Sequence, residues 1–182
     1  MPLSPLEALE ESQQNARFVL DREPDNLLMK AQLGYIQKDL ANLHYQNGSK
    51  SEGDEALRSA EQTFETVLAS DAFDASAHNG LGNVYAMRGD YDAAIREYKI
   101  ATSLAPEYTY SWYDMALSVQ QKIITESEFS EQSLRDLTTA VITALKLHVS
   151  EDHSPQKLPP GALSALFGIK DWIVKLADAA AE

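Results

Sequence analysis

The sequence contains no cysteine and few glycines or prolines, and these absences exclude several structures and chemistries. Without cysteine the chain forms no disulfide, carries no thiolate nucleophile and builds no zinc–cysteine site. Only 8 Gly and 7 Pro interrupt 182 residues that are rich in Ala, Leu, Glu, Gln and Lys, a composition that favours helices. No β-rich alternation of apolar and polar residues competes with this pattern, so we expect an all-α protein.

Basic residues are also scarce, because 15 Lys and Arg oppose 28 Asp and Glu and leave a net charge of -13. A broadly acidic surface repels phosphate, so we expect neither nucleic acid nor an anionic membrane as a partner. A protein or peptide partner should dock through a basic or neutral surface. No apolar run approaches the roughly 18 residues of a membrane span. The N-terminal sequence has no basic segment followed by an apolar one, so we expect no signal peptide and a cytoplasmic location.

The stretch 75–108, ASAHNGLGNVYAMRGDYDAAIREYKIATSLAPEY, has small and large residues at regular helical positions. A first cluster consists of Leu81, Gly82 and Tyr85, and a turn follows at Gly89-Asp90-Tyr91. A second cluster consists of Ala94 and Tyr98, and the stretch ends with Ala101 to Pro106. This stretch resembles the tetratricopeptide repeat family, whose unit is a 34-residue helix–turn–helix with W-x2-L-G-x2-Y, A-x3-F and P at these positions. His78 in the tryptophan position is the one departure.

The resemblance implies a single all-α domain over residues 1–182, a helical-repeat solenoid of about three repeats between capping helices. We predict an N-terminal capping half-repeat (1–33), an extended first repeat (34–74), a second repeat (75–108), a degenerate third repeat (109–150), and a proline-rich linker with a C-terminal capping helix (151–182).

The first predicted repeat is longer than the family's unit. Leu33-Gly34 and Leu40-Ala41 both fit the Leu-Gly position, so two registers are possible for one long helix over 27–47. Since the two positions lie about two turns apart, a lengthened helix accommodates both. We expect its partner helix over 52–69, after a polar, mobile loop over 48–53. Further helices are predicted over 6–22, with Ser4-Pro5 as the start, and over 109–125 and 130–149.

The last predicted helix, 162–181, has an apolar face that is too broad to lie against water. Leu166, Ile169, Ile173 and Leu176 line one side, and Leu163, Phe167 and Val174 widen it. We favour a capping helix packed on the third repeat, because a solenoid has to cover its terminal apolar face. A self-association surface and a plug for the chain's own groove are the alternatives.

The sequence offers little catalytic chemistry, since it contains no nucleophile elbow, phosphate-binding loop or zinc-protease string. His148, Glu151, Asp152 and His153 combine imidazole with carboxylate, but a separation of five positions between the histidines fits no familiar ligand spacing. We interpret this cluster as a solvated helix end. We therefore predict no enzyme activity, no cofactor and no metal.

In tetratricopeptide proteins the first helices of successive repeats line a concave groove that receives a peptide or a partner helix. The resemblance implies that the groove-lining positions here are Tyr35, Lys38, Asn42, Tyr45, Ser76, Asn79, Asn83, Met87, Tyr110, Tyr113, Asp114, Leu117 and Gln121. Asparagine amides can pair with an extended peptide backbone, and tyrosines add rigid contact area. These positions favour a protein-interaction module acting as scaffold or adaptor. A self-assembling structural protein, joined through the last helix or the long first-repeat hairpin, is the alternative.

One subset of the family binds acidic chaperone tails through a clamp of lysines, arginine and asparagines. Lys38 and Asn42 match the first pair of that clamp. Gly80, Tyr110 and Asp114 depart from its other positions, and one cation does not hold a carboxylate pair. We therefore do not expect this chain to bind such tails.

Overall fold

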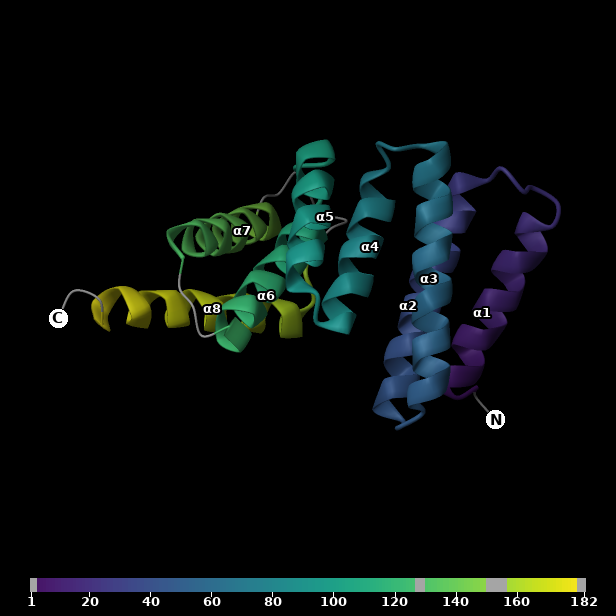
Figure 1. The fold of residues 1–182 in the computed structure, drawn as a ribbon, viewed down its shortest axis with the longest axis horizontal. Coiled ribbons are helices and arrows are strands. Elements are labelled where there is room, and N and C mark those ends of the chain that lie inside the picture. Colours follow the sequence, from purple (N-terminus) through teal and green to yellow (C-terminus); the bar gives the residue numbers. More distant parts are fainter. Residues whose placement is uncertain (1–2, 127–129, 150–156, 180–182) are drawn as a thin grey trace. The chain divides into compact units, whose positions relative to one another are not determined.

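A computed structural model describes residues 3–126, 130–149 and 157–179, and all regular structure among them is helical. The chain forms two compact units, Met1–Arg88 and Gly89–Glu182. The first unit contains α1 (Pro5–Leu20), α2 (Leu27–Gln46), α3 (Lys50–Ser70) and α4 (Ala75–Arg88), and the second contains α5 (Tyr91–Leu104), α6 (Thr109–Glu126), α7 (Glu131–Val149) and α8 (Pro160–Ala179) (Figure 1). The all-α, helical-repeat prediction is confirmed, whereas the individual repeat limits remain predictions.

Local sequence explains where the helices begin and end. The Ser4 hydroxyl accepts a hydrogen bond from the Glu7 amide while the Glu7 carboxylate accepts one from the Ser4 amide, a capping box that starts α1. Asp90 caps α5 by accepting from the Ala93 amide at 3.0 Å. Gly48 and Gly89 follow α2 and α4 with φ of 79° and 80°, a conformation that glycine adopts without steric cost.

The first unit packs each helix against its neighbour in the sequence, and α2 also contacts α4. Phe64 of α3 is fully buried at the centre of this core. Its ring lies so close to Gly34 of α2 and Gly80 of α4 that a Cβ atom at either position would come within 2.7 Å and 2.3 Å of it, respectively. The edge of the Tyr35 ring meets Phe64 at 5.1 Å between centroids. Two glycines thus make room for one aromatic ring that joins three helices.

The hairpin of α2 and α3 extends further than the sequence predicted. The expected mobile loop over 48–53 is wrong, because α3 already begins at Lys50. Buried Gly53 lies beneath Tyr45, whose ring would be 2.6 Å from a Cβ atom at that position. The hairpin therefore has two close glycine contacts, Gly34 of α2 with Phe64 and Gly53 of α3 with Tyr45, while the choice between the two proposed registers remains a prediction.

The second unit also packs sequential helices together, and α8 contacts both α6 and α7. Leu166 and Ile169 of α8 are buried, as are Ile123 of α6 and Leu137 and Val141 of α7. These contacts place α8 against α6 and α7, and its role as the C-terminal cap of the array remains a prediction. In the part of the chain that the structure describes, we find no helix that combines the length and hydropathy of a membrane span.

Candidate functional site

Three of the predicted groove residues of the first unit meet where α2 lies beside α4. The Tyr35 hydroxyl donates a hydrogen bond to the Ser76 carbonyl at 2.8 Å and accepts one from Asn79 Nδ2 at 3.3 Å. Asn79 is only 2% exposed, so its amide is part of the joint between the two helices. The contacts among Tyr35, Ser76 and Asn79 therefore join α2 to α4, the two helices that carry the other predicted groove residues of the first unit.

Lys38 and Asn42 follow Tyr35 along the same side of α2. The Lys38 ammonium lies 5.9 Å from the centre of the Tyr35 ring and pairs with Asp39 at 2.7 Å. Because Asp39 neutralises much of its charge, Lys38 adds little attraction for an anion. Asn42 is exposed one turn further on, and Asn83 and Met87 of α4 are half-buried. These residues therefore supply amide and thioether groups on α2 and α4 of the first unit.

Tyr45 lies at the far end of this face and has a structural partner. Its hydroxyl donates to Asp54 at 2.7 Å, and burial, followed by this hydrogen bond, raises the pKa of Tyr45 to about 12. Nearby, Arg88 of α4 forms a two-pronged pair with Glu61 of α3, at 2.7 and 2.8 Å. These contacts fix the end of the first unit's face.

The predicted residues of the second unit all belong to α6. Tyr110, Tyr113, Asp114 and Leu117 are half-buried, and Gln121 is exposed. Burial raises the pKa of Tyr113, and the Asp114 carboxylate raises it further. This face therefore combines neutral phenol groups with one carboxylate at ordinary pH. Such a face disfavours an acidic tail.

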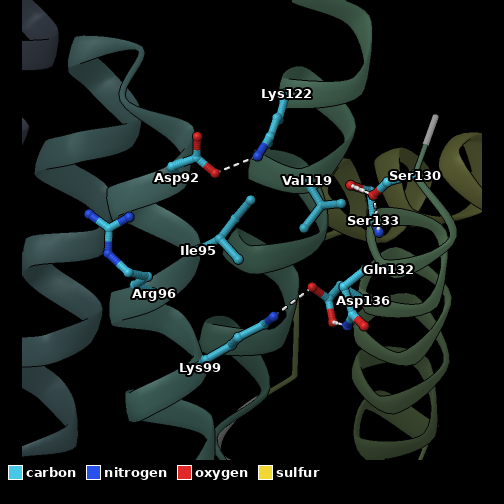
Figure 2. A pocket seen from close by; sticks show the side chains of 10 residues that line it. All are labelled: Asp92, Ile95, Arg96, Lys99, Val119, Lys122, Ser130, Gln132, Ser133 and Asp136. Carbon is cyan, nitrogen blue, oxygen red and sulfur yellow. Dashed lines mark hydrogen bonds and ion pairs between the residues drawn. The ribbon is translucent and has the colours of Figure 1, made fainter. Parts of the chain in front are cut away.

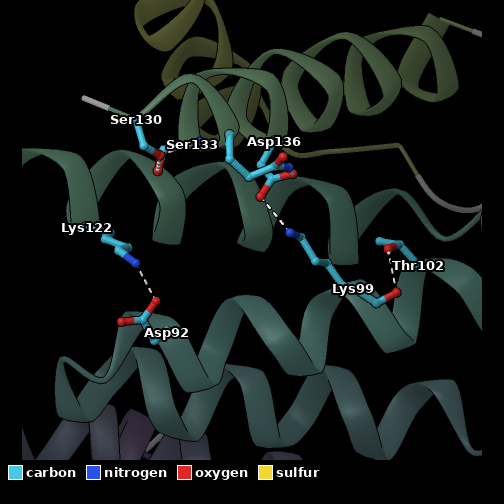
Figure 3. Close-up of polar contacts among 8 residues, drawn as sticks. Asp92, Lys99, Thr102, Lys122, Ser130, Ser133 and Asp136 are labelled. Atoms are coloured by element: carbon cyan, nitrogen blue, oxygen red, sulfur yellow. Dashed lines mark hydrogen bonds and ion pairs between the residues drawn. The ribbon is translucent and has the colours of Figure 1, made fainter. Parts of the chain in front are cut away.

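A polar cleft of about 260 Å³ in the second unit escaped the sequence analysis (Figure 2). It lies among α5, α6 and the start of α7, and two ion pairs cross it (Figure 3). Lys99 Nζ meets Asp136 Oδ2 at 2.6 Å, and Lys122 pairs with Asp92. The first pair is 37 residues apart in the sequence and the second is 30 residues apart, so no local pattern marks either pair. Since each lysine faces a carboxylate, the cleft fastens α5 to α6 and α7.

Only His148 of the histidine and carboxylate cluster lies among the described residues, within which no group of three potential metal ligands occurs. His148 Nδ1 accepts a hydrogen bond from the Leu158 amide at 3.1 Å, which gives this ring a structural role before α8. Glu151, Asp152 and His153 lie outside the described residues.

Comparison with known proteins gives a match to one family model and similarity to solved structures, among them two of one protein. Residues 38–109 match the model of the tetratricopeptide repeat family. Two crystal structures of MamA are similar to the chain, with TM-scores of 0.40 and 0.43 at 16% and 19% sequence identity. The alignments cover 80% of this chain in both cases, and 98% and 87% of the respective MamA chains. The search of curated proteins found no match.

Proposed function

Because residues 38–109 match the model of the tetratricopeptide repeat family, we propose that the protein is an interaction module that binds a peptide or partner helix on its first-helix faces. Tetratricopeptide repeats are typically non-enzymatic modules that bind other proteins. The observation that carries the proposal is the joint between α2 and α4, where Tyr35 contacts both Ser76 and Asn79. This joint lies between the leading helices of two successive repeats, as a groove-forming array requires.

The chemistry of the first unit's face supports a ligand that is held mainly by its backbone. Exposed Asn42 offers a donor pair and an acceptor, and half-buried Asn83 and Met87 lie on the neighbouring helix. Tyr35 and Asn79 hold this face in place, so little side-chain freedom would be lost there on binding. On the second unit, the α6 face offers Tyr110, Tyr113 and Gln121 for a similar role.

The charge of the chain supports a basic or neutral docking surface on the partner. For the first-helix faces, the net charge of -13 and the Asp114 carboxylate on α6 disfavour an acidic partner. In this proposal the protein is an adaptor or scaffold that selects its ligand by shape and amide hydrogen bonds.

The test selects peptides from a displayed random library on the wild-type protein and measures their affinity for variants. Asn42→Ala combined with Asn83→Ala should weaken the selected peptides by about 1 to 3 kcal/mol, because peptide polar groups lose their partners. Asn15→Ala on the exposed side of α1 makes the same chemical change elsewhere and should leave affinity unchanged. Unchanged affinity in the double variant, with helicity intact, would contradict the proposal.

A further inference from the structure

We propose that a groove between α7 and α8 in the second unit binds an acidic amphipathic helix from another protein. This surface is separate from the first-helix faces, and the inference does not rest on the proposed function. The groove has a volume of about 360 Å³ and is lined mainly by Val141, Ile142, Leu145, Ile173 and Val174. Its lining is thus aliphatic along both helices.

The groove begins where the packing between α8 and its neighbours ends. Along one side of α8, Leu166 and Ile169 are buried, while Ile173, one turn further, is only half-buried. The edges remain open to water, since Ile142 is 45% exposed and Val174 is 50% exposed. An apolar strip that extends past the helices packed against it is typical of a binding surface.

Charge around this groove has the opposite sign to that of the chain. Lys146 of α7 and Lys170 of α8 line it, one from each wall. No Asp or Glu is among the lining residues, although Asp136 and Asp171 lie close to them in the sequence. Among the described side chains, no carboxylate forms a salt bridge with Lys146 or Lys170. Both ammonium groups are thus available to a ligand's carboxylates.

These observations favour an amphipathic helix with carboxylates on both sides of its apolar stripe. The part of α7 that lines the groove runs from Thr138 to Lys146, about 12 Å, which matches roughly two turns of a bound helix. Such a ligand would place its apolar residues against Val141 and Ile173 and its carboxylates near the two lysines, a helix-in-groove arrangement.

The same charges disfavour a second copy of this chain as the occupant. In a two-fold symmetric dimer through this surface, each copy presents the same patch to the other. Lys146 and Lys170 of both copies would then be brought together, and like charges in a desolvated interface repel.

The experiment uses two labelled synthetic peptides of about four helical turns with leucines at i, i+3, i+4 and i+7. One carries glutamates beside the leucine stripe, and its twin carries lysines at the same positions. Fluorescence anisotropy at low salt should show at least about tenfold tighter binding of the acidic peptide to the wild-type protein. Lys146→Glu combined with Lys170→Glu should reverse this preference, and Ile142→Asp should weaken both peptides.

A matched control is Lys50→Glu combined with Lys175→Glu, the same change of charge at exposed lysines that do not line the groove. It should retain the wild-type preference, and circular dichroism should show equal helicity in all variants. Equal binding of both peptides, or no binding up to about 1 mM, would overturn the proposal. Sedimentation equilibrium that shows a wild-type dimer, dissociated by Ile142→Asp, would also overturn it and identify a second copy as the occupant.

Discussion

The two units solve the same packing problem with different side chains. In the first unit, the fully buried Phe64 ring fits against Gly34 and Gly80, and three helices meet around it. In the second unit, ion pairs join α5 to α6 and α7, while Gly161 and Gly168 of α8 have open space beside them. The difference lies in what accompanies the buried ring: Phe64 of the first unit fits against two glycines, whereas the second unit buries Tyr98 and adds ion pairs between its helices.

We expect the largest effect on stability from adding one methyl group at Gly80, which lies against the Phe64 ring. Gly80→Ala would place a Cβ atom 2.3 Å from the Phe64 ring, which is enclosed on all sides and cannot move aside cheaply. We expect a loss of about 1 to 3 kcal/mol in the free energy of unfolding, despite the higher helix propensity of alanine. Chemical denaturation measures this loss.

Gly168→Ala is the matched control in the second unit, because a Cβ atom there would meet nothing within 4 Å. It should stabilise the protein by up to about 1 kcal/mol. Adding Phe64→Leu to Gly80→Ala should recover part of the loss, since the smaller side chain leaves room for the methyl group. If Gly80→Ala has the same free energy of unfolding as the wild type, the Phe64 ring is not confined by its neighbours.

The sequence predicts the helices well because their limits depend on local chemistry. Ser4, Asp90, Gly48 and Gly89 each act within one turn of their own position, so start and end signals are visible in a single chain. The small residue at Gly34 was also visible as part of the repeat pattern. Its partner Phe64, by contrast, could be assigned only to the A-x3-F spacing of the repeat within its own helix and not to two glycines on other helices.

The candidate site was less predictable because its properties depend on contacts between distant residues. Asn42 and Asn79 have the same side chain and the same predicted role, yet Asn42 is exposed and Asn79 is buried beside Tyr35. Likewise, Lys99 and Asp136 have no sequence spacing that marks them as partners. Repeat position identifies the helix face, whereas burial on that face is decided by the neighbouring helix.

Tyr45 gives a pH-dependent test of the extended hairpin in the first unit. Its pKa is raised to about 12, so the folded state holds the phenol proton more tightly than the unfolded state does. This contribution to stability is complete below the ordinary tyrosine pKa near 10 and is lost as the pH rises toward 12. Tyr45→Phe should cost about 1 kcal/mol at neutral pH through loss of the hydrogen bond to Asp54.

The measurement is the difference in unfolding free energy between wild type and Tyr45→Phe as a function of pH. This difference should shrink between about pH 10 and 12, where the wild-type contribution disappears. Tyr91→Phe in the second unit provides the same chemical change as a control. A constant difference over this interval would show that the phenol of Tyr45 is not stabilised in its protonated form.

The smallest expected effect concerns the ion pair between Lys99 and Asp136 in the second unit. Because Lys99 is about half exposed, water and salt screen the pair, and a double-mutant cycle with alanine at both positions should give a coupling of only about 0.2 to 1 kcal/mol. The two-pronged Arg88–Glu61 pair in the first unit has two hydrogen bonds in a fixed geometry and should couple more strongly. Raising the salt concentration should weaken both couplings. A stronger coupling for Lys99–Asp136 than for Arg88–Glu61 would reverse the predicted order and show that the ion pair in the cleft contributes more to stability.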